Sequence, residues 1–132
     1  MTKVVLDTNV FISALFWKGV PYQIFKRILE GAILNFTSNQ ILEELRRRLL
    51  DKFKLSPEKV KEFLEIIVFN SQIVYPKKKL KIVKKDLSDN KIIECALEAK
   101  ASFIISGDEH LLEIKEYKGV KIISPKEFLL LI

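Results

Sequence analysis

Several acidic side chains stand where a globular protein does not ordinarily place a charge. Asp7 directly follows an apolar, β-branched run, and Asp108 lies just beyond a second such run. Asp89 opens a helical pattern and, at about 100° per residue, falls over the same stripe as Ile92 and Ile93. Carboxylates that converge repel one another and need a cation to offset the repulsion. The set therefore indicates a site for a hard divalent cation such as Mg²⁺, which prefers oxygen ligands.

A glutamate is the fourth candidate, but helical periodicity does not choose between Glu43 and Glu44. Each lies about 130° from the centre of the apolar stripe of its helix, one on either side. Either residue can instead form a solvated pair with an arginine four positions later, Glu43 with Arg47 or Glu44 with Arg48. From the residues alone the choice stays open, and a surface pair is the default interpretation of a helical glutamate.

Each aspartate also has an ordinary explanation. Asp7 can cap the helix that follows it, Asp89 can complement the dipole of its helix from the first turn, and Asp108 can belong to a turn with Gly107. These explanations account for the acids one at a time. They do not explain why all of them are placed where one site can form.

The elements that must position the acids alternate between strands and helices. Apolar, β-branched runs predict strands over residues 4–6, 33–37, 73–75, 103–106 and 120–123. Helical spacing and capping residues predict helices that begin near Asn9, Pro21, Ser38 or Asn39, Ser56-Pro57, Asp89, Glu109 and Ser124-Pro125. This alternation predicts an α/β fold with a mainly parallel five-stranded sheet flanked by helices on both faces. Such sheets bind ligands at the carboxyl ends of their strands, where Asp7 and Asp108 are expected.

Composition limits the class of protein without naming a function. A chain of 132 residues with 48% hydrophobic and 30% charged residues is typical of one globular domain. The lone Cys95 excludes an internal disulfide and a cysteine-cage metal site, and it is expected to be a small buried apolar residue. No segment resembles a signal peptide or a membrane span, which predicts a cytoplasmic location.

Basic residues outnumber acidic ones, giving a formal net charge of +6 that favours polyanionic partners. They gather in two clusters that can steer RNA towards a locally acidic site or simply form solvated faces: Arg46, Arg47, Arg48, Lys52 and Lys54, and Lys77, Lys78, Lys79, Lys81, Lys84 and Lys85. The single histidine, His110, follows the fourth predicted strand, and we expect it to have an ordinary surface or packing role.

Four segments resemble the motifs of the PIN-domain family. They are Val4-Val5-Leu6-Asp7-Thr8-Asn9-Val10, the segment from Ser38 to Leu45, Asp86-Leu87-Ser88-Asp89-Asn90-Lys91, and Ile104-Ile105-Ser106-Gly107-Asp108. They occur in the family's order and cover nearly the whole chain, with most similarity to VapC-like ribonucleases, the toxins of toxin–antitoxin pairs. The resemblance implies that residues 1–132 form one PIN domain.

The resemblance also implies a site and a reaction. Asp7, Glu44, Asp89 and Asp108 would be the catalytic, metal-binding residues of an endoribonuclease that hydrolyses RNA with Mg²⁺ or Mn²⁺. Asn9 and Ser106 would support that site. Asp86, three positions before Asp89, is a further acid that can assist the metal or replace Asp89. The implied partners are RNA, a second copy of the chain in a homodimer, and an antitoxin that blocks the groove.

Three other classes of protein fit this pattern less well. A haloacid-dehalogenase-type phosphatase requires a second acid where this chain has Asn9, and a response-regulator receiver requires a phosphoacceptor after the third strand, where Tyr75-Pro76 stands. The remaining alternative is a PIN-like module that binds RNA or protein without cutting. The presence of all four acids favours the nuclease.

Overall fold

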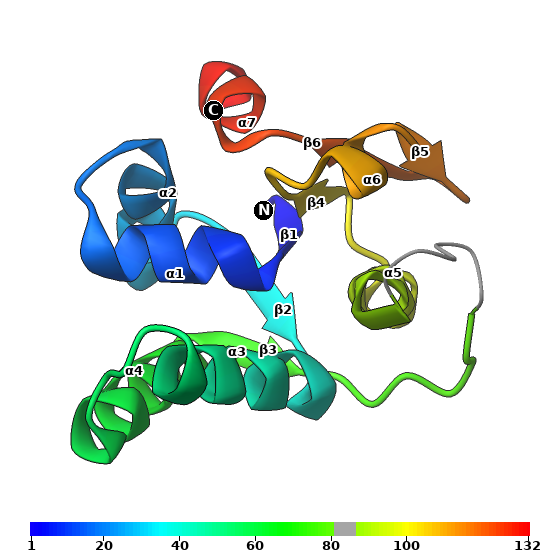
Figure 1. Cartoon of the computed structure of the whole chain (residues 1–132). Helices are drawn as coiled ribbons and strands as arrows, with labels where there is room; N and C mark the ends of the chain where they lie inside the picture. The colour runs from blue at the N-terminus through cyan, green and yellow to red at the C-terminus, as the bar shows by residue number, and fades with distance from the viewer. Residues whose placement is uncertain (81–86) are drawn as a thin grey trace.

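The computed structural model describes residues 1–80 and 87–132 (Figure 1). Asp86 and the lysines at positions 81, 84 and 85 lie outside the described residues. The strands are β1 Lys3–Leu6, β2 Leu34–Thr37, β3 Ser71–Ile73, β4 Phe103–Ile105, β5 Glu116–Tyr117 and β6 Val120–Ile123. The helices are α1 Thr8–Phe16, α2 Val20–Leu29, α3 Asn39–Asp51, α4 Pro57–Phe69, α5 Leu87–Ala99, α6 Glu109–Leu112 and α7 Pro125–Leu131.

The strands form one sheet in the order β3-β2-β1-β4-β6-β5, and all neighbours are parallel except β5 and β6. After β1 the chain builds outwards to β2 and β3 on one side, then returns to place β4 on the other side of β1. The order of strands therefore reverses between β1 and β4. In open α/β sheets, the crevice at the carboxyl ends of the strands at such a reversal is the usual place for a ligand.

Alternating side chains divide the core into two clusters, one on each face of the sheet. Val4 and Leu6 pack with α1, α2, α3, α4 and α7, whereas Val5 packs with α5 and α6. This follows from the two-residue period of a strand. Figure 1 shows α1 and α2 on one side of β1 and α5 on the other. The predicted sheet with helices on both faces is therefore confirmed.

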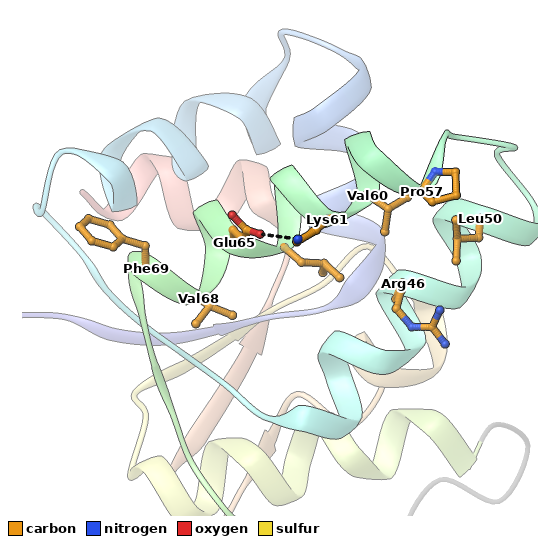
Figure 2. Close-up of a pocket in the computed structure, with 9 residues that line it drawn as sticks. Arg46, Leu50, Pro57, Val60, Lys61, Glu65, Val68 and Phe69 are labelled. Atoms are coloured by element: carbon orange, nitrogen blue, oxygen red, sulfur yellow. Dashed lines mark ion pairs between the residues drawn. The ribbon is translucent and has the colours of Figure 1, made fainter.

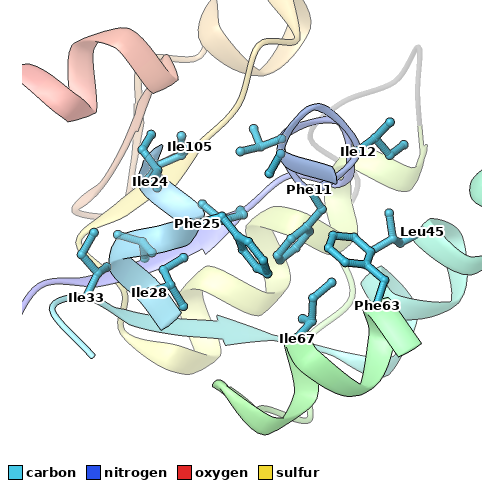
Figure 3. Packing of buried hydrophobic residues seen from close by; sticks show 14 of the residues in the cluster. Phe11, Ile12, Ile24, Phe25, Ile28, Ile33, Leu45, Phe63, Ile67 and Ile105 are labelled. Carbon is cyan, nitrogen blue, oxygen red and sulfur yellow. The ribbon is translucent and has the colours of Figure 1, made fainter. Parts of the chain in front are cut away.

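Three phenylalanine rings meet among the aliphatic side chains of the first cluster (Figure 3). The rings of Phe11 and Phe25 meet edge to face with centroids 6.1 Å apart, and Phe25 lies 5.7 Å from Phe63. Phe11 is fully buried on α1, about one helical turn after the first acid, Asp7. Packing on this face thus fixes the beginning of α1 relative to the sheet.

Two details of the sheet differ from the sequence prediction. The third strand is Ser71–Ile73, earlier than the predicted 73–75, because its pairing with β2 begins where Ser71 lies opposite Asn35. The strand ends before Tyr75, which is exposed, and Pro76, which has no N–H to donate. The sheet also gains β5, a short antiparallel edge strand. The turn between β5 and β6 has positive φ at Lys118 (47°) and Gly119 (90°), as a two-residue hairpin requires. Lys-Gly is a weaker turn signal than Asn-Gly, so this hairpin was missed.

Of the helices in the described ranges, none combines the length and the apolar character needed to cross a membrane. Cys95 lies on α5 with its side chain fully buried, as predicted. Burial raises the pKa of its thiol to about 12, although a hydrogen bond with Ser38 acts in the opposite direction. At neutral pH the group is therefore a packed, protonated thiol rather than a nucleophile.

Native protein should for this reason react with a thiol reagent such as DTNB only as it unfolds. We expect less than about 5% labelling in the time that fully labels the urea-denatured chain, because the thiolate is the reactive form. A native thiol that titrates as fast as free cysteine would contradict the buried placement of Cys95.

Candidate metal centre

The register of β1 against β4 places the first acid. Leu6 pairs with Ile105, so the next residues, Asp7 and Ser106, leave the sheet side by side. The Ser106 hydroxyl donates to Asp7 Oδ2 at 2.7 Å, and both residues are buried, with Asp7 only 3% exposed. The carboxylate is therefore fixed by a neutral donor at the point where the strand order reverses.

Asp7 also begins α1. Its Oδ1 accepts from the Thr8 N–H at 2.7 Å, and its carbonyl oxygen accepts from the N–H of Val10 at 3.0 Å. This is the helix-capping role that the sequence allowed, and it coexists with a place in the site. Each carboxylate oxygen can accept more than one hydrogen bond or ligand, so Asp7 can cap α1 and still bind a cation.

Asp108 is brought to the same place by the turn after β4. The Ser106 hydroxyl, which donates to Asp7, accepts from the Asp108 N–H at 3.0 Å. One buried hydroxyl thus holds the side chain of the first acid and the backbone of the last. Asp108 then caps α6, its Oδ1 accepting from the His110 N–H at 2.8 Å.

Asp89 lies on α5 with its side chain 4% exposed, in the first turn of a helix that begins at Leu87. Asp89, Asp108 and His110 each offer one ligand atom, and these atoms lie within 4.8 Å of one another. Ligands on opposite sides of a cation with bonds of about 2.1 Å are about 4.2 Å apart. These three side chains are therefore close to coordination distance.

The two glutamates of α3 lie in different surroundings. Glu43 is exposed and forms a bidentate pair with Arg46, at 2.6 Å and 2.9 Å. Glu44 is half-buried and lies close enough to Asp7 to repel its charge. Neither of the pairs that the spacing allowed, Glu43 with Arg47 or Glu44 with Arg48, is among the ion pairs of the described residues.

His110 lies on α6 beside Asp108. It is exposed, as expected for a surface histidine, but its Nδ1 lies 3.6 Å from Asp108 Oδ1 and joins Asp89 and Asp108 in the ligand group. Asn9, in contrast, is exposed, and its side-chain oxygen accepts from Arg48 at 2.6 Å.

The electrostatics of the site centre on Asp7. Burial raises the pKa of its carboxyl group above the ordinary value, and the charges of Glu44 and Asp108 raise it further. The hydrogen bonds from Ser106 and Thr8 act in the opposite direction without offsetting these effects. A divalent cation would relieve both the burial and the repulsion, and carboxylate oxygens are the ligands that Mg²⁺ and Mn²⁺ prefer. The donor set therefore fits a hard divalent cation.

A separate groove lies between α3 and α4 (Figure 2), and it contains none of the four predicted acids. Its volume is about 510 Å³ and its lining is mainly apolar: Arg46, Leu50, Pro57, Val60, Lys61, Leu64, Glu65, Val68 and Phe69. The charged groups at its edge are already paired, Lys61 with Glu65 at 4.0 Å and Arg46 with Glu43. This groove suits hydrophobic contact rather than phosphate chemistry.

The raised pKa of Asp7 makes a prediction about stability without metal. A carboxyl group whose folded-state pKa is raised stabilises the fold most below its unfolded pKa of 3.8, and this contribution is lost as pH rises through the folded-state value. Asp7→Asn removes the charge while leaving an oxygen to accept from the Thr8 N–H.

In EDTA at pH 7, the variant should therefore melt at a higher temperature than wild type. The increase should be about 4 °C for each 1 kcal/mol that the substitution adds to the free energy of unfolding. The difference should shrink at pH 4, and thermal denaturation followed by circular dichroism measures it. An equal or larger difference at pH 4 would mean that Asp7 is not held at a raised pKa.

Comparisons with known proteins agree with this architecture. The family model described as "PIN domain" matches residues 3–110. A relative from Methanocaldococcus jannaschii, "Uncharacterized protein MJ1680", is 35% identical over 140 aligned positions, which cover 96% of this chain and 89% of the relative. Among solved structures, VapBC2 from Rickettsia felis, bound to a DNA fragment from its promoter, superposes with a TM-score of 0.64. It covers 93% of this chain and 98% of the other at 15% identity, a likeness of fold alone. The chain belongs to the PIN-domain family.

Proposed function

We propose that this chain is a metal-dependent endoribonuclease whose site is formed by Asp7, Glu44, Asp89 and Asp108. The observation that carries the proposal is the central position of Asp108. The Ser106 hydroxyl joins the backbone of Asp108 to the Asp7 carboxylate, and the Asp108 side chain shares a ligand group with Asp89 and His110. The two parts of the site therefore meet at one residue. Asp7 and Asp108 follow β1 and β4, between which the strand order reverses, and open α/β sheets usually bind ligands at that edge.

In this proposal Asp7, Asp89 and Asp108 hold Mg²⁺ or Mn²⁺, and Glu44 orients or deprotonates the attacking water. When bound, the cation neutralises the acids, polarises the phosphate and makes water more acidic. Ser106 is a positioning residue, since its hydroxyl fixes the Asp7 carboxylate and the backbone of Asp108. The half-buried position of Glu44 beside Asp7 supports its role, because a base must reach the water while keeping its orientation.

RNA is the proposed substrate because a phosphodiester backbone complements a formal net charge of +6 around a locally acidic centre. The four acids would repel RNA without a cation, so binding and metal loading are coupled. The proposal covers residues 1–132 as one domain acting in the cytoplasm. It includes a homodimer and an antitoxin partner, the latter supported by the fold neighbour VapBC2.

His110 bears on which cation is used. Mg²⁺ takes oxygen ligands almost exclusively, whereas imidazole nitrogen suits softer divalent metals better. If His110 binds the cation directly, Mn²⁺ should support more activity than Mg²⁺, and His110→Ala should reduce that preference. If it only hydrogen-bonds near Asp108, the variant should reduce activity with both metals alike.

The nuclease proposal predicts cleavage that requires both metal and acids. Wild-type protein should cut a mixture of structured and single-stranded RNAs with Mg²⁺ or Mn²⁺ and not in EDTA. Asp89→Asn and Glu44→Gln should each lose at least about 100-fold in rate, the scale on which a positioned acid or base contributes. Gel electrophoresis of labelled RNA measures both.

Glu43→Gln is the matched control for Glu44→Gln, because it changes the neighbouring residue of the same helix and has an exposed side chain. Its rate should stay within about twofold of wild type. Equal losses of cleavage rate in Glu43→Gln and Glu44→Gln would mean that the substitutions disturb the helix rather than remove a group of the site. RNA binding by clean wild-type protein without cleavage in any metal would favour the non-catalytic PIN-like module.

A further inference from the structure

Arg48 reaches from α3 across to the beginning of α1. Its Nη1 donates to Asn9 Oδ1 at 2.6 Å, which joins two helices that are 39 positions apart in the sequence. Asn9 stands two residues after Asp7, and Arg48 stands four residues after Glu44. The hydrogen bond therefore connects the residues that follow two acids of the site.

The helical spacing sets how close this guanidinium lies to the acids. Four residues advance an α-helix by about 6 Å and turn it by about 400°, so Arg48 and Glu44 share a face one turn apart. The contact with Asn9 shows that this face looks towards α1, whose first turn Asp7 caps. Arg48 thus borders the site on the side formed by Asp7 and Glu44, and its side chain is half-buried there.

The guanidinium has not been neutralised by the acids around it. Across residues 1–80 and 87–132, no carboxylate lies within 4.0 Å of Arg48 as an ion pair, and Glu44 leaves it unpaired despite the favourable spacing. Arg46 two positions earlier behaves differently, since Glu43 takes both of its donor groups. A guanidinium has five N–H donors, and the bond to Asn9 uses one of them. The charge and most of the donors remain available to an anion.

We propose that Arg48 is a phosphate-binding residue that takes a phosphodiester oxygen of RNA beside the acidic centre. Asn9 is then a positioning residue, whose amide oxygen holds the guanidinium away from Glu44. Arginine suits this task because its planar fork can give two parallel hydrogen bonds to phosphate. The identity of the ligand as RNA rests on the proposed function, whereas the phosphate-binding property can be measured without cleavage.

The competing interpretation is that Arg48 only joins α1 to α3. A structural bond would affect the melting temperature but would not change how RNA binding responds to salt. A phosphate contact releases counterions, so its loss lowers the slope of log affinity against log salt by about 0.7 for a single strand. The salt slope therefore separates the two interpretations.

The experiment measures binding of a fluorescein-labelled single-stranded RNA by anisotropy from 50 to 300 mM KCl with Mg²⁺ present. All proteins carry Asp89→Asn so that the RNA stays intact. Arg48→Gln should weaken binding about tenfold and lower the salt slope by about 0.7, whereas Arg48→Lys should keep the slope and recover part of the affinity. Arg47→Gln is the matched control, because it removes the same charge from the adjacent, exposed position.

Asn9→Ala should weaken RNA binding by a few-fold and leave the salt slope unchanged. The charge of Arg48 is still present, but its guanidinium is no longer positioned by the Asn9 side chain. The proposal is overturned if Arg48→Gln changes the affinity and the salt slope no more than Arg47→Gln does. If Arg48→Gln weakens binding and lowers the salt slope but the wild-type protein never cuts RNA, the nuclease proposal is wrong and the phosphate contact stands.

Discussion

The pairing of Leu6 with Ile105 is the constraint on which the site depends. It places Asp7 and Ser106 next to each other at the carboxyl ends of β1 and β4, where the strand order reverses. A shift of one residue would move every side chain of the strand to the opposite face and separate the hydroxyl from the carboxylate. The register is protected because both faces are buried, with Val5 packed on one side and Leu6 on the other.

The groups that hold the Asp7 carboxylate are neutral, and this has a functional consequence. Asp7 is fixed by a hydroxyl and a backbone N–H rather than by lysine or arginine, although the chain has 23 basic residues. A neutral donor orients a carboxylate without neutralising it, so the charge is retained for a cation. The burial and repulsion that raise the pKa of Asp7 are the cost in stability of keeping the site in this form.

Local patterns predicted the parallel core of the fold because β-branched runs and helix caps act over a few residues. The same patterns could not choose between Glu43 and Glu44, since both flank the apolar stripe at similar angles. That choice depends on tertiary neighbours: Arg46 faces solvent with Glu43, whereas Asp7 lies on the side of Glu44. The approach of His110 to Asp89 was equally beyond local patterns, because it joins α6 to a helix that lies earlier in the chain.

The three consecutive arginines of α3 show why net charge says little about where an anion binds. Successive residues of a helix point about 100° apart, so Arg46, Arg47 and Arg48 face three different surroundings. Arg46 is paired with Glu43, Arg47 is exposed to solvent, and Arg48 contacts Asn9 beside the acids. Only the last of these combines a retained charge, a fixed position and proximity to the site. A phosphate contact therefore follows from the direction of one side chain in the basic cluster, rather than from the +6 charge that all of them share.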